Sequence, residues 1–143
     1  ATATPYFERA LSINEKKYGS QHPNVAINLN NLAHAYGEQR KRYPEAEALY
    51  LRALDIRVNS SGANHPDVAY ILNELGALYL KQRKYSKAEP LFLSALNIWK
   101  ESLGPNDPNV NIALQNLNAL QSEANRYKPR ETPEMTAPRR GNY

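Results

Sequence analysis

His22, His65 and Asp107 are the residues whose types and spacing first suggest chemistry. Each lies directly before a proline, and the three places are 43 and then 42 residues apart. Imidazole and carboxylate groups bind metal ions and transfer protons. Polar side chains at the start of a helix, however, also accept hydrogen bonds from unpaired backbone amides. We favour capping or turn packing over metal binding at these positions, and we expect no metal site.

His34 is the remaining histidine, and no acid and nucleophile accompany it in a recognisable catalytic arrangement. A contact with a ligand or plain exposure explains this residue better than general-base catalysis. The sequence has no cysteine, which excludes a thiolate nucleophile, a disulfide framework and a thiolate zinc site. We therefore expect neither an enzyme nor a bound cofactor.

The composition is that of one soluble folded domain. Of the 143 residues, 41% are hydrophobic and 22% are charged. No apolar run approaches the roughly 20 residues that span a membrane, and Ala1 to Pro5 lack the features of a signal peptide. The absence of cysteine removes any clue to redox compartment, so the compartment stays open, with the cytoplasm as the default.

The net charge of +4 is unevenly distributed along the chain. Residues 126–143 carry five basic and two acidic side chains, which places +3 there and leaves +1 for everything before. A nucleic-acid binder usually carries a basic stripe on its folded part. Because the body of this chain is nearly neutral, we expect no nucleic-acid partner.

Three segments repeat one pattern, at offsets of 43 and then 42 residues. Each contains an Ala-Leu-x-Ile block, then a glycine, then a proline and a Leu-x-x-Leu block. The glycines are Gly19, Gly62 and Gly104, and the prolines are Pro23, Pro66 and Pro108. Glycine ends helices because it adopts backbone conformations that other residues avoid, and proline suits the first helical turn. Each period therefore contains the end of one helix and the start of the next.

Between these signals the apolar residues recur at steps of three and four, which indicates helices with one buried stripe. The expected helices cover residues 3–18, 23–39, 44–60, 66–82, 87–102 and 108–125. The extra residue of the first period falls in 37–43, where we expect a turn. Two helices per period predict an all-α stack of antiparallel helical hairpins.

Leu75-Gly76-x-x-Tyr79, followed by Ala88, Phe92 and Ala95, resembles the signature of the tetratricopeptide repeat family in its longer, kinesin-light-chain-like form. The same places in the preceding repeat are filled by Leu32, Ala33, Tyr36, Ala46, Tyr50 and Ala53. The resemblance covers residues 1 to about 125 and implies a tetratricopeptide-like α-α superhelix.

The two ends of the stack depart from the pattern. In the last hairpin Asn118 and Gln121 replace the small residue and the tyrosine, as expected for a polar terminal cap. Helix 3–18 aligns with the second helix of a hairpin, so its partner is missing and one apolar side should be uncovered. We expect either a fragment of a longer array or cover by another chain, including self-association. The Pro- and Arg-containing tail, 126–143, is expected to be disordered unless bound.

The resemblance also implies that the first helix of each hairpin lines a concave groove that cradles a peptide or helix. Carried over by spacing, the groove positions are Ile27, Asn30, His34, Glu38, Tyr70, Asn73, Ala77, Lys81, Ile112, Gln115 and Ala119. Asn30, Asn73 and Gln115 form a carboxamide ladder that resembles a clamp on the backbone of a ligand. The alternative is that these amides only hold neighbouring helices in register.

We therefore expect a protein–protein interaction module that binds a peptide or protein segment in its groove. Ile27, Tyr70 and Ile112 would form the apolar floor, and Lys81 would favour acidic ligands. The alternative is a scaffold subunit that docks into a larger assembly through its end faces and its tail. Groove substitutions that leave partner capture unchanged, with loss of capture on deletion of 126–143, would favour the scaffold.

Overall fold

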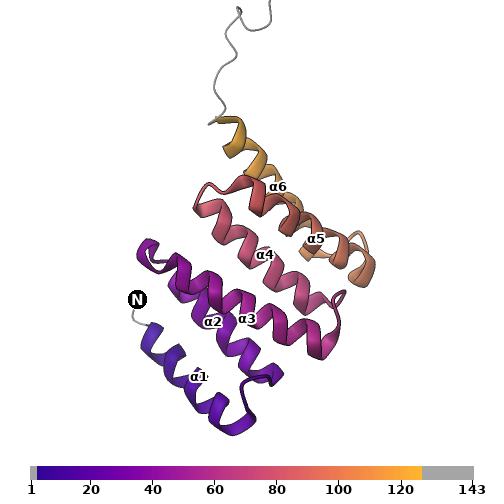
Figure 1. Ribbon diagram of the computed structural model, residues 1–143. Helices are drawn as coiled ribbons and strands as arrows, with labels where there is room; N and C mark the ends of the chain where they lie inside the picture. The colour runs from indigo at the N-terminus through magenta and orange to yellow at the C-terminus, as the bar shows by residue number, and fades with distance from the viewer. Residues whose placement is uncertain (1–2, 127–143) are drawn as a thin grey trace, which may run out of the picture.

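A computed structural model describes residues 3–126 of the chain. The helices in order are α1 (Thr4–Tyr18), α2 (Pro23–Gly37), the short 3₁₀ helix η1 (Arg40–Arg42), α3 (Tyr43–Ser61), α4 (Pro66–Lys81), α5 (Tyr85–Leu103) and α6 (Pro108–Arg126). They stack side by side from α1 at one end to α6 at the other (Figure 1). This part of the chain holds six α-helices and no strand, so the predicted all-α stack of hairpins is confirmed. Apart from Arg126, the predicted tail lies outside the described residues.

The side chains before the helix-starting prolines are caps. His22, His65 and Asp107 each accept a hydrogen bond from the backbone N–H two residues further along, at 3.1, 3.0 and 2.9 Å. Each bond satisfies one of the amides that a helix start leaves unpaired. The capping role predicted for these three residues is therefore confirmed.

Three glycines end the second helices of the hairpins. Gly19, Gly62 and Gly104 have φ values of 88, 90 and 91° with ψ near 160°. This combination is open almost only to glycine, because a Cβ atom would clash with the backbone. Apart from the glycine and its two chain neighbours, no atom of the described residues lies within 4 Å of a Cβ built at these positions, so the backbone conformation alone demands glycine.

The extra residue of the first repeat lies in the turn inside its hairpin. There α2 ends at Gly37, two residues earlier than expected, and the 3₁₀ turn Arg40–Arg42 leads into α3. The matching turn in the next repeat has no such helix, and Arg83 takes a positive φ of 60° to close it. That tighter turn lets α5 begin at Tyr85 instead of the expected residue 87.

The contacts between helices give the stack its curvature. The first helices touch across repeats, α2 against α4 and α4 against α6. Within residues 3–126, the second helices α1, α3 and α5 have no Cα atoms within 8 Å of one another. The first helices are therefore closer together than the second helices, which makes the α2–α4–α6 side the concave one.

Gly76 on α4 lies directly against the ring of Phe92 on α5. A Cβ atom at this position would lie 2.8 Å from that ring, which is fully buried. Real Cβ atoms do not approach a ring carbon so closely. Of the residues in the predicted family signature, Gly76 therefore leaves the space that the ring of Phe92 occupies.

Tyrosine–carboxylate pairs join successive hairpins. Tyr36 on α2 donates to Glu8 on α1 at 2.6 Å, and Tyr79 on α4 donates to Glu47 on α3 at 2.7 Å. Burial, followed by the bonded carboxylate, raises the pKa of each tyrosine to about 12. Both phenols therefore remain neutral donors throughout the ordinary pH range.

Candidate functional site

Ile27, Tyr70 and Ile112 occupy the same register position on α2, α4 and α6. Each is about half exposed, although each is a large side chain with apolar surface. Because the three first helices lie on the concave side, these residues form one row along the groove. Two hollows lie between α2 and α4, and each is closed by a residue of α3.

The first hollow lies beside the starts of α2 and α4 and has a volume of about 180 Å³. Ile27 and Tyr70 line it, together with Asn30, whose Oδ1 is buried without a hydrogen-bond partner. Arg57 reaches in from α3 and is mostly buried, with its Nη1 3.6 Å from Oδ2 of Asp67. The positive and negative charges at this end of the groove therefore compensate each other.

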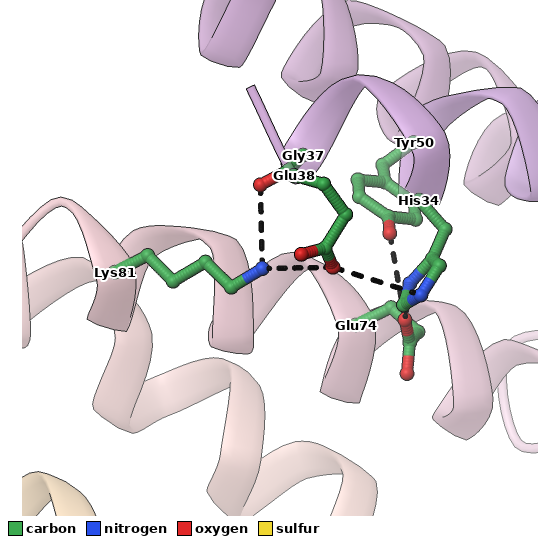
Figure 2. A network of polar contacts seen from close by, with 6 residues as sticks. All are labelled: His34, Gly37, Glu38, Tyr50, Glu74 and Lys81. Atoms are coloured by element: carbon green, nitrogen blue, oxygen red, sulfur yellow. Dashed lines mark hydrogen bonds and ion pairs between the residues drawn. The ribbon is translucent and has the colours of Figure 1, made fainter. Parts of the chain in front are cut away.

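The second hollow, of about 170 Å³, is built around Glu74. Its Oε2 accepts hydrogen bonds from Nδ1 of His34 at 3.2 Å and from the hydroxyl of Tyr50 at 3.4 Å (Figure 2). The Glu74 side chain is 20% exposed. Burial, followed by the Glu74 charge, raises the pKa values of Tyr50 and of nearby Tyr70. Both tyrosines therefore stay neutral in the ordinary pH range.

Lys81 lies at the rim of the same hollow, and its ammonium group is already paired. Nζ lies 3.3 Å from Oε1 of Glu38 and 3.3 Å from the carbonyl oxygen of Gly37 (Figure 2). Glu38 also lies 3.8 Å from Nε2 of His34. Lys81 was predicted to favour acidic ligands. Its charge is instead compensated by Glu38 within the protein.

The three carboxamides predicted as a ladder are not joined to one another by hydrogen bonds within residues 3–126. Asn73 is buried, and its Oδ1 accepts a 2.7 Å bond from Nδ2 of Asn116, which ties α4 to α6. Gln115 is exposed on α6. A similar bond of 2.6 Å ties Asn14 on α1 to Asn28 on α2. Asn73 therefore also helps to hold α4 and α6 in register.

Among the other predicted positions, Ala77 lines the second hollow and Ala119 is exposed on α6. Glu74 was not among the predicted site residues, although its spacing from three of them could have indicated it. Tyr70, Glu74, Ala77 and Lys81 follow one another at steps of four, three and four, which places them on one helix face. Tyr50 and Arg57 were missed because they come from α3, a second helix.

Within the described part of the chain, no three His, Cys, Asp or Glu residues are grouped in a way that could hold a metal ion. None of the helices in this part is long and apolar enough to cross a membrane.

The stacked hairpins and the groove lined by their first helices define a helical-repeat protein. The tetratricopeptide repeat profile matches three overlapping segments, residues 1–57, 38–99 and 67–129. The chain therefore belongs to the tetratricopeptide repeat family. Tetratricopeptide repeats are generally protein–protein interaction modules.

Solved structures with the same fold come from kinesin-light-chain-like proteins. The structure of BtubC (BKLC) from P. vanneervenii superposes with a TM-score of 0.66 at 24% sequence identity, over 99% of this chain and 61% of that one. A kinesin light chain-like protein of nearly identical TPR-like repeats from Podosopora anserina gives 0.68 at 19% identity, over 94% and 71%. The chain spans less than two thirds of BtubC. No curated protein sequence matches it.

Proposed function

We propose that this chain binds an extended peptide or protein segment in the groove of α2, α4 and α6. The row of Ile27, Tyr70 and Ile112 is the observation that carries the proposal. Half-exposed apolar side chains in register along a concave surface can bury area against a ligand, and aromatic residues in such places dominate binding energies. The first hollow, which Tyr70 lines, and the second hollow around Glu74 provide room for ligand side chains.

Polar groups of the groove would fix the backbone of the ligand. Asn73 still has its side-chain Nδ2 as a donor, since only Oδ1 is engaged by Asn116. Gln115 offers both a donor and an acceptor at the α6 end, and Asn30 lines the first hollow. His34, Glu38 and Lys81 would contact the ligand through their exposed edges, while Ala77 and Ala119 leave space for it.

A matched pair of substitutions tests the groove. Tyr70 and Leu51 are 49% and 47% exposed, but Leu51 lies on α3 and lines neither hollow. Peptides selected from a random dodecapeptide library on the chain would be measured by fluorescence anisotropy. Tyr70→Ala is expected to raise Kd about tenfold or more, because truncation of an aromatic contact costs about 2 kcal/mol. Leu51→Ala is expected to change it less than twofold. Equal effects of the two substitutions would refute groove binding.

A second function, permanent docking through an end face, is favoured by α1. Ile13 is 57% exposed, whereas the equivalent Ile56 on α3, which packs against its hairpin partner α2, is 1% exposed. Tyr6 lies on the same exposed face of α1, in a hollow with Ile13. Capture of a protein partner that is lost on Ile13→Glu and unchanged by Tyr70→Ala would support docking. Sedimentation velocity of the wild type would reveal self-association through this face.

A further inference from the structure

The groove between α2 and α4 has an uneven charge balance. Arg57 is paired with Asp67 in the first hollow, and Lys81 is paired with Glu38 at the rim of the second. Among residues 3–126, Glu74 is then the groove carboxylate that pairs with no lysine or arginine, since its contact is with His34. With Glu38 at the rim included, two carboxylates, Glu38 and Glu74, therefore stand against the one ammonium group of Lys81 at the second hollow.

Glu74 is held in place before any ligand arrives. Both of its protein hydrogen bonds, from His34 and from Tyr50, end on Oε2. Oε1 has no partner in the described part of the chain and carries no contact in Figure 2. A carboxylate that is fixed by two donors and 20% exposed loses little side-chain entropy on binding. Its free oxygen is an acceptor for a charged donor.

The end of α2 supplies a further acceptor at this place. α2 ends at Gly37 and α4 ends at Lys81, so both helices end at the same end of the groove. The Gly37 carbonyl already accepts from the Lys81 ammonium group. The protein's own lysine thus shows the kind of group that this surface attracts.

We propose that the ligand of this groove is a basic peptide segment, with an arginine or lysine side chain seated beside Glu74. The aliphatic part of such a side chain fits the apolar wall of Ala77 and Leu78, and its charged end matches Oε1 of Glu74. The preference is opposite to the acidic ligand that Lys81 suggested from the sequence. The proposal rests on the groove function proposed above.

The experiment uses the full chain and the random dodecapeptide library. The wild type is expected to enrich arginine and lysine over aspartate and glutamate. For a selected peptide, Glu74→Gln should raise Kd about tenfold, because it removes the charge and keeps the shape of the side chain. Glu89→Gln, which removes an exposed carboxylate from α5, is the control and should change Kd less than twofold. Lys81→Gln should tighten binding by about threefold, since it releases the Glu38 carboxylate.

A double-mutant cycle locates the contact. Replacing the basic residue of the peptide by glutamine should weaken binding to the wild type and have little further effect on Glu74→Gln. Enrichment of acidic peptides, or tighter binding by Glu74→Gln, would overturn the basic preference. If Tyr70→Ala still weakened binding in that case, groove binding itself would stand. A library that yields no bound peptide would overturn both proposals.

Discussion

Replacing Asn73 with alanine removes a buried carboxamide that joins α4 to α6. The bond from Asn116 is short, 2.7 Å, and Asn73 itself is buried. A hydrogen bond of this kind contributes about 0.5–1.5 kcal/mol net, and an unpaired buried partner adds to the cost of its loss. Asn116 is only half-buried, so water can partly replace the lost partner. We expect Asn73→Ala to lower the free energy of unfolding by about 1–2 kcal/mol.

Urea unfolding would measure this loss, with Trp99 as a local probe. Trp99 is buried in the cluster that α5 forms with Val110 and Ala113 of α6, so its fluorescence reports the docking of the last helix. A double-mutant cycle of Asn73→Ala with Asn116→Ala should give a coupling energy of about 0.5–1.5 kcal/mol. A coupling below about 0.3 kcal/mol would refute the tie between α4 and α6. If stability stayed unchanged while peptide affinity fell, Asn73 would act as a clamp alone.

Two further predictions concern helix packing and pH. Gly76→Ala should destabilise the chain by about 1–3 kcal/mol in urea unfolding, because the added methyl group would overlap the ring of Phe92. Gly37→Ala is the control, because its Cβ would lie at an ordinary contact distance of 3.5 Å from the Leu78 side chain. This variant should leave the free energy of unfolding unchanged or slightly raised. Equal losses of stability for the two variants would contradict the packing argument. The pKa values of Tyr36 and Tyr79 are about 12 in the folded chain and about 10 when unfolded, so their contribution is complete below pH 10 and lost as pH rises towards 12. Urea unfolding between pH 8 and 11.5 should show this decline. Replacing both tyrosines with phenylalanine should make it shallower, with a remaining decline from Tyr50 and Tyr70, whose pKa values are also raised. An unchanged slope would count against the raised pKa values of Tyr36 and Tyr79.

The fold could be read from the sequence because its signals are local and repeated. Gly62 and Pro66, for example, end α3 and start α4 through backbone preferences that belong to single residues. Their recurrence in each period made the number and order of helices predictable. The exact turn lengths were harder to predict, because the inserted residue could either lengthen a helix or form the 3₁₀ turn that is observed.

The candidate site was less predictable, because it depends on helix rotation and on pairs distant in sequence. Asn73 and Glu74 are neighbours, and their side chains point about 100° apart around the axis of α4. Glu74 faces the second hollow, while Asn73 turns towards α6. The pairing of Lys81 with Glu38 joins residues 43 apart, and no local pattern indicates it. The proposed charge preference of the groove therefore rests on pairings that only the structure shows.

Thiol protection tests groove binding most directly, because the chain has no cysteine of its own. Ala119 on α6 and Ala48 on α3 are both exposed alanines, and only Ala119 is a predicted groove position. Ala119→Cys and Ala48→Cys variants would be treated with a maleimide, with and without a saturating library-selected peptide. The account predicts that the peptide slows modification at position 119 several-fold and leaves position 48 unchanged. Protection at position 48, or equal rates at both positions, would contradict it.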